Sequence, residues 1–165
     1  MNKLARRYIG VLAAIVSYYI VHEGAHLLYA LATGVFKKIR FMGIGMQIVV
    51  EDTAMTNSQL GLFCLVSAVA TLLVGYALVL LTGRICRVES LPFRAIMYYI
   101  TIAMLLMDPL YLSLLCGFFG GGDMNGISLL LPELAARLIF GALLILNGLI
   151  FWKIVLPKYT RAIQK

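Results

Sequence analysis

The sequence predicts an all-α polytopic membrane protein with about four transmembrane helices and one short β-hairpin after the first of them. Of its 165 residues, 62% are hydrophobic and only 13% are charged, whereas about 25% of the residues in soluble domains are charged. Four apolar stretches are also long enough for the roughly 20 residues that cross a bilayer as a helix. No polar stretch is long enough for a separate soluble domain, so residues 1–165 are predicted to form a single integral-membrane domain.

The four predicted spans are delimited mainly by glycine and proline. Gly34 follows the first span and is expected to cap its C-terminal end. Pro109 lies inside the third span, whereas Pro132 precedes the fourth span and Pro157 is expected to end it. The predicted spans are Tyr8–Thr33, Leu60–Thr82, Phe93–Phe118 and Glu133–Leu156.

Two connecting segments stand out. Val35–Asp52 is rich in Val, Ile and Phe, is too short to span, and has Gly43 and Gly45 near its middle. It is therefore predicted to be a β-hairpin that dips into the bilayer or lies against the helices. Gly117–Ser128 contains three consecutive glycines, which favour a flexible loop over a regular helix there.

Charge and cysteine content exclude some classes of protein. The net charge is +7, but the basic residues flank apolar runs, as they do when they contact lipid headgroups, so no nucleic-acid partner is expected. Three cysteines with no Cys-x-x-Cys spacing are expected to be small apolar packing residues. They are Cys64, Cys86 and Cys116.

The first span carries the His-Glu-x-x-His pattern, at His22, Glu23 and His26, and these are the only two histidines of the chain. On a helix, residues four apart lie on one face, so both imidazoles can bind one Zn²⁺ while Glu23 acts as general base. Ionisable groups are costly at membrane depth, which favours a functional site.

A catalytic zinc ion takes three protein ligands, and with no third histidine the remaining ligand should be a carboxylate. Asp123, in the glycine-rich loop, is the first choice, with Asn125 as a polar partner. Asp108 is the alternative ligand, or a residue that lines a water path or binds substrate. It precedes Pro109, which would free a backbone carbonyl and loosen the third span.

The order of these elements resembles the site-2 protease family of intramembrane zinc metalloproteases. After the motif come Gly34, then Phe41 with Gly43-Ile44-Gly45, and later the turn Asp123-Met124-Asn125-Gly126. The resemblance covers about residues 8 to 130. The family's Gly-Pro-x-x-Asn pattern is not apparent, and the matching region reads Ser67-Ala68-Val69-Ala70-Thr71, which indicates a minimal, divergent member.

The resemblance implies one zinc ion per chain, bound by His22, His26 and Asp123, with Glu23 as general base. It implies hydrolysis of peptide bonds in or near the transmembrane segments of membrane proteins or peptides. The alternatives are a non-proteolytic zinc-binding membrane protein, or a small transporter subunit that uses Asp108 and Asp123 as translocation charges. The transporter hypothesis gives no reason for the motif's spacing, and zinc binding alone needs no general base.

The protein is expected to be a multi-pass protein of the cell membrane, with a membrane-spanning peptide or protein and the bilayer itself as partners. The pattern assigns no oligomeric state. Basic residues are concentrated on the side of the two termini, and the positive-inside rule therefore favours cytosolic termini. The family resemblance implies the opposite orientation, with the hairpin and zinc on the cytosolic side.

Overall fold

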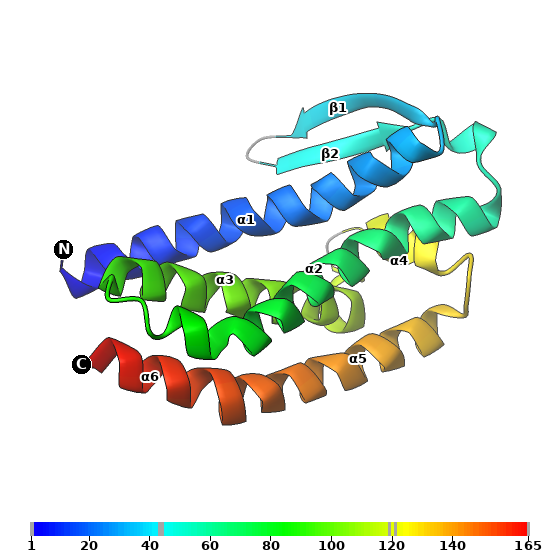
Figure 1. Cartoon of the computed structure of the whole chain (residues 1–165). Helices are drawn as coiled ribbons and strands as arrows, with labels where there is room; N and C mark the ends of the chain where they lie inside the picture. Colours follow the sequence, from blue (N-terminus) through cyan, green and yellow to red (C-terminus); the bar gives the residue numbers. More distant parts are fainter. Residues whose placement is uncertain (1, 43–44, 119, 121, 165) are drawn as a thin grey trace.

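The protein folds as a bundle of four long helices with a two-stranded antiparallel sheet, as predicted (Figure 1). The computed structural model describes residues 2–42, 45–118, 120 and 122–164. All four helices are long and apolar enough to cross a membrane. The elements are α1 (Lys3–Ala32), β1 (Phe36–Met42), β2 (Gly45–Val50), a 3-10 turn (Asp52–Ala54), α2 (Asn57–Ile85), α3 (Leu91–Leu110) with a π-helical turn (Tyr111–Leu115), α4 (Gly122–Ile127), and α5 (Glu133–Ile150) joined by a π-helical turn (Phe151–Val155) to α6 (Leu156–Gln164).

Helix α3 lies at the centre of the bundle and packs against α1, α2 and α5. The hairpin lies along α1, on the side away from α5, and the two chain termini lie at the same end of the bundle (Figure 1). Large apolar side chains cover the outer faces of the helices, for example Leu28 on α1 and Leu80 on α2. A surface of this kind suits contact with lipid chains rather than with water.

Helices α1 and α2 each begin earlier than predicted because polar residues cap them. The side chain of Asn2 accepts a hydrogen bond from the Ala5 N–H. Thr56 and Gln59 form a reciprocal capping box at the start of α2. The apolar pattern alone therefore underestimates the helix lengths at these ends.

Pro109 does not loosen α3 in the way the sequence suggests. A proline lacks the N–H that would bond the carbonyl four residues earlier, here that of Leu105. Asn147 of α5 donates its side-chain Nδ2–H to that carbonyl at 2.8 Å. Its Oδ1 accepts the hydroxyl of Tyr76 at 2.8 Å, so every group in this buried set has a partner. The proline thus becomes a cross-link between α3 and α5.

The prediction that the fourth span stops before Pro157 is wrong. The chain continues through the π-helical turn Phe151–Val155 into α6. A π-helical turn widens the backbone, which gives the proline ring room beside the preceding turn, and only one N–H is lost. The last helix therefore reaches Gln164.

The predicted hairpin is confirmed. Strands β1 and β2 pair in antiparallel register, with Ile39 opposite Ile48, and β2 packs on α1. Ile48 is buried and joins the central apolar cluster, which explains why the hairpin lies against the helices. The predicted glycine turn at residues 43–44 lies outside the described residues.

The stretch Gly117–Ser128 is predicted from the sequence to be a loop without regular helix. This prediction is wrong in part, because the stretch contains the short helix α4. Gly120 has a φ of 90°, a conformation that suits glycine, and the chain enters the helix two residues later. Gly126 fixes where α4 lies: a Cβ at this position would stand 2.2 Å from the Sγ of Cys64 on α2. Close backbone approach, rather than flexibility, is the role of this glycine.

The cysteine prediction agrees with the structure. Cys64, Cys86 and Cys116 are free, and Cys64 and Cys116 lie in the central apolar cluster. Cys86 is half-buried beside a second small cluster near the termini.

Candidate metal centre

Helix α1 presents three aromatic side chains four residues apart on one face: Tyr18, His22 and His26. Both histidines are buried, and their ring centroids lie 5.1 Å apart. Tyr18 packs on His22 with a centroid separation of 5.2 Å. Helical periodicity alone thus brings the two imidazoles together inside the bundle.

The inner nitrogens of the two histidines converge on Asp123. His22 Nε2 lies 3.2 Å from Asp123 Oδ2, and His26 Nε2 lies 3.4 Å from Asp123 Oδ1. The ligand atoms of these three residues all lie within 4.8 Å of one another, so one metal ion could be held among them. The first turn of α4, placed by Gly126, carries this carboxylate across to α1.

The outer nitrogen of each histidine has a different partner. His22 Nδ1 lies 3.1 Å from Asp108 Oδ1, while His26 Nδ1 lies 2.9 Å from the carbonyl oxygen of Phe63. An acceptor on Nδ1 places the proton there and leaves the Nε2 lone pair free for a metal. The two imidazoles are therefore oriented as metal ligands require.

Asp108 is itself held firmly. Its carboxylate accepts the Tyr18 hydroxyl at 2.5 Å and the Thr71 hydroxyl, and it is almost fully buried. Tyr18, His22 and Thr71 come from two helices, so Asp108 of α3 ties α1 to α2 at this depth. A carboxylate fixed in this way positions the imidazole rather than binding a ligand of its own.

Charge also suits Asp123 to a ligand role. Burial by itself would raise the pKa of this carboxyl, but the imidazoles of His22 and His26 beside it outweigh burial and hold the pKa below its usual value. Asp123 is therefore ionised at neutral pH, which is the form that binds a metal.

A cavity of about 410 Å³ opens beside the three residues. Glu23 lines it, and its Oε2 accepts a hydrogen bond from the Ile48 N–H of β2 at 3.3 Å. One wall is the strand segment Gly45–Ile48, and the C-terminal half of α3 contributes Met107. The cavity is large enough for several residues of an extended peptide segment or for a small ligand.

The two other candidates from the sequence, Asp108 and Asn125, do not lie at the Nε2 atoms of the histidines. Asp108 approaches the outer nitrogen of His22, and Asp123 rather than Asp108 lies at the inner nitrogens. Asn125 is exposed and lines a separate hollow beside Glu133. It does not serve as a partner of Asp123, because residues two apart on a helix point to different faces.

Sequence reasoning missed the residues that hold the histidines and the glutamate. Tyr18 could have been found, since it stands four residues before His22 on the same face. Thr71 is a polar residue in an apolar span, which is a weaker signal. The carbonyl of Phe63 and the N–H of Ile48 are backbone groups, so no residue type reveals them.

Comparison of the chain with protein-family models, with curated proteins and with solved structures finds no match. The case for a function therefore depends on the site itself.

Proposed function

We propose that the protein is an intramembrane zinc metalloprotease of the cell membrane, which hydrolyses peptide bonds in or near transmembrane segments. One observation carries the proposal: two imidazole Nε2 atoms and one carboxylate converge beside a cavity that a second carboxylate, Glu23, also lines. Two histidines and an acid form a ligand set that catalytic zinc sites use. A binding site without turnover has no need of Glu23.

His22, His26 and Asp123 would hold the ion, with Asp108 and the Phe63 carbonyl orienting the two imidazoles. When bound, zinc supplies Lewis-acid activation of water and of a peptide carbonyl. The donor set fits zinc well, because imidazole and carboxylate are both common zinc ligands and each ring already has its outer hydrogen bond.

Glu23 is proposed as the general base. It takes a proton from the attacking water and later gives it to the leaving amine. The Ile48 N–H holds one of its oxygens and so keeps the side chain in the cavity. A carboxylate that accepts only one such bond still has an oxygen available for the water.

Strand β2 is proposed to bind the substrate. A helical substrate hides its scissile carbonyl in hydrogen bonds and must unwind before it is cut. The Ile48 N–H points away from β1, and backbone groups two residues along a strand point to the same edge, so Met46 faces that edge too. Both residues line the cavity, where an unwound segment could pair with them by β-addition.

The test is metal analysis of the purified protein together with cleavage of a membrane-spanning peptide in detergent or vesicles. Wild type should contain one zinc ion per chain and cleave the peptide. Glu23→Gln should keep the zinc and lose cleavage by about 100-fold or more. Glu89→Gln is the matched control: this exposed glutamate lies outside the cavity, so both properties should stay unchanged.

Two outcomes would overturn the proposal. Zinc-loaded wild type with no cleavage of any membrane-spanning peptide would favour the non-proteolytic zinc protein. Glu23→Gln with full cleavage would remove the general base from the mechanism. For the strand, Met46→Pro should reduce cleavage and leave zinc content unchanged, because proline removes an N–H from the free edge of β2 and leaves the ligands in place; undiminished turnover would refute β-addition.

A further inference from the structure

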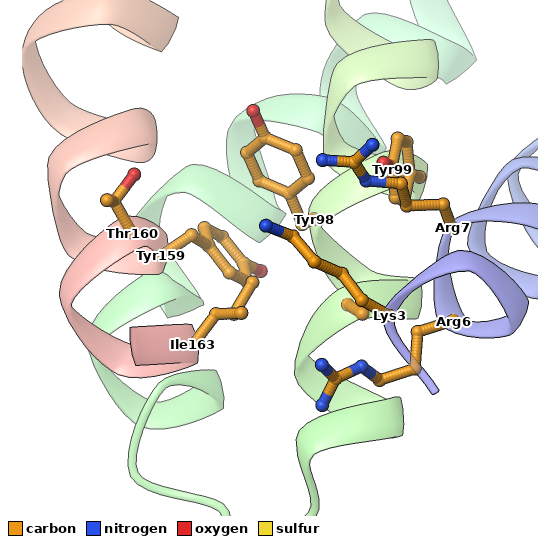
Figure 2. A pocket seen from close by; sticks show the side chains of 9 residues that line it. Lys3, Arg6, Arg7, Tyr98, Tyr99, Tyr159, Thr160 and Ile163 are labelled. Atoms are coloured by element: carbon orange, nitrogen blue, oxygen red, sulfur yellow. The ribbon is translucent and has the colours of Figure 1, made fainter. Parts of the chain in front are cut away.

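A second cavity, of about 500 Å³, lies at the opposite end of the bundle, beside the two termini (Figure 2). Three basic side chains from the first turns of α1 line one side of it, and tyrosines from α3 and α6 line the other. We call it the basic cavity. Its polar and aromatic lining residues are Lys3, Arg6, Arg7, Tyr98, Tyr99 and Tyr159.

The cations of the basic cavity have no acidic counterpart. Among the described residues, Lys3, Arg6 and Arg7 make no ion pair with any aspartate or glutamate, and no acidic residue lines the cavity. Figure 2 shows the side chains of Lys3 and Arg7 extending toward the tyrosines. Three positive charges gathered around one hollow repel each other unless an anion enters.

The tyrosines form a rigid opposite wall. The ring of Tyr98 packs edge-on against those of Tyr99 and Tyr159, each at a centroid separation of 5.3 Å. Tyr99 in turn lies against the α1 backbone at Gly10, where a Cβ would stand 2.3 Å from its ring. The Tyr159 ring is fully buried, which holds it in place in this wall.

The position of the cavity in the membrane indicates the source of the anion. It is lined by the start of α1, the first turns of α3 and the end of α6, and three candidate spans therefore begin or end around it. This is the level at which lipid headgroups meet a spanning protein, and tyrosine and arginine are the residues typical of that level. The start of α1 also adds the positive end of its helix dipole.

We propose that the basic cavity binds the phosphate of an anionic phospholipid headgroup. Arginine guanidinium groups bind phosphate oxygens in a bidentate fork, lysine adds a point charge, and tyrosine hydroxyls donate hydrogen bonds. With three cations and no acid, the lining favours a headgroup that carries net negative charge over a zwitterionic one. This site is independent of the proposed protease chemistry.

The experiment is a lipid titration of the detergent-purified full chain, with bound lipid counted by native mass spectrometry. Dioleoylphosphatidylglycerol is the anionic probe and dioleoylphosphatidylcholine the zwitterionic one. The cavity variant is Lys3→Gln, Arg6→Gln, Arg7→Gln. The control variant, Arg84→Gln, Arg87→Gln, Arg161→Gln, removes the same charge from exposed residues that do not line the cavity.

Wild type should bind the anionic lipid at least about 10-fold more tightly than the zwitterionic one. The cavity variant should lose on the order of 100-fold in affinity for the anionic lipid, given a contribution of about 5-fold from each cation. The control variant should stay close to wild type. Equal losses of affinity in the two variants, or equal binding of the two lipids, would overturn the proposal. Either result would mean that lipid binding does not depend on the basic cavity.

Two further arms complete the test. Inorganic phosphate at millimolar concentration should not displace the lipid; complete displacement would mean that the cavity takes free phosphate instead. If the triple variant does not fold, Tyr98→Phe keeps all the charges and the ring packing and should weaken anionic-lipid binding by a few-fold. An unchanged affinity in Tyr98→Phe would then count against the cavity as the site.

Discussion

The candidate metal centre and the basic cavity lie toward opposite ends of α1, and they differ in whether their polar side chains have partners within the protein. His22 is 19 residues after Lys3, or about 28 Å along a helix that rises about 1.5 Å per residue. At the metal centre each histidine has a partner for both ring nitrogens. At the basic cavity the three cations have no acidic partner among the described residues.

At the metal centre the protein itself supplies the partners of its polar groups, whereas the basic cavity depends on an anion from outside the chain. At membrane depth an unpaired polar group is costly, so the protein supplies the partners itself, as Asp108 and Phe63 do. At the headgroup level the bilayer can supply anions, and the protein needs only to gather cations around a hollow. Each site should therefore fail in a different way when its residues are replaced.

Loss of the third ligand should have the largest effect. Asp123→Asn removes the carboxylate that lies against both Nε2 atoms, and zinc affinity should fall by more than the roughly 100-fold that a partner of Nδ1 contributes at most. Anionic-lipid binding should be unaffected. Isothermal titration with zinc measures the zinc affinity. Asp52→Asn, at the exposed 3-10 turn, is the control and should leave that affinity unchanged. If Asp123→Asn bound zinc as tightly as wild type, the assignment of Asp123 as a metal ligand would be wrong.

Loss of the outer carboxylate should come next. Asp108→Asn keeps the size of the side chain but removes the charge that holds His22 Nδ1, and zinc affinity should fall about 10- to 100-fold. His26 should be less sensitive to Phe63→Leu, because this change removes the ring that packs on His26 at a centroid separation of 4.5 Å but leaves the backbone carbonyl that accepts from Nδ1. A zinc titration of Asp108→Asn beside Phe63→Leu measures both. If the two variants lose zinc equally, the comparison between the two histidines is wrong.

Two glycine contacts, one at each site, allow a paired test. Gly126→Ala places a Cβ against Cys64 and should cost about 2 kcal/mol of unfolding free energy and displace Asp123. Gly10→Ala places a Cβ against the ring of Tyr99 and should disturb the basic cavity while leaving zinc affinity intact. Thermal unfolding and zinc titration measure these effects.

Gly83→Ala is the control for both, because a Cβ there meets no atom within 4 Å. It should be neutral or slightly stabilising, since alanine favours a helix over glycine. The paired test would fail if Gly10→Ala lost zinc as readily as Gly126→Ala.

An exposed ion pair on the hairpin should have the smallest effect and calibrates the others. Lys37 Nζ lies 2.7 Å from Glu51 Oε2, and this hydrogen bond holds the pKa of Glu51 below its usual 4.5. The pair therefore stabilises the folded hairpin above the ordinary glutamate pKa, and this stabilisation is lost as the pH falls through the lowered value. Glu51→Gln should lower the unfolding midpoint slightly at pH 7, and by progressively less as the pH falls below the ordinary glutamate pKa. A larger difference at acid pH would reverse the sign of this linkage.

The fold could be predicted from sequence because length and hydropathy alone define membrane spans. The hairpin was also predictable, since its glycines and β-branched residues lie between two spans. The ends of the helices were not, because Asn2 and Thr56 extend them by capping, and Pro157 is tolerated within a π-helical turn that hydropathy does not reveal.

The meeting of the two motif histidines with Asp123 could be predicted, because helical spacing and ligand chemistry restrict the choices; their role as zinc ligands stays a prediction. The role of Asp108 could not be predicted, since it depends on which face of α3 meets His22. The function of Gly126 was equally hidden, because a close approach to Cys64 belongs to the packed structure and not to the local sequence. Asn125 was misplaced because a short helix replaces the expected loop.

The hydrogen bond between Asn147 and the Leu105 carbonyl has a consequence for the walls of the cavity beside Glu23. Because it ties α3 to α5 close to Pro109, the wall that includes Met107 is braced against the rest of the bundle. The opposite wall is β2, which reaches α1 through packing and through the bond from Ile48 to Glu23. The cavity therefore lies between one wall that is cross-linked within the helix bundle and another that is a two-stranded sheet packed on α1.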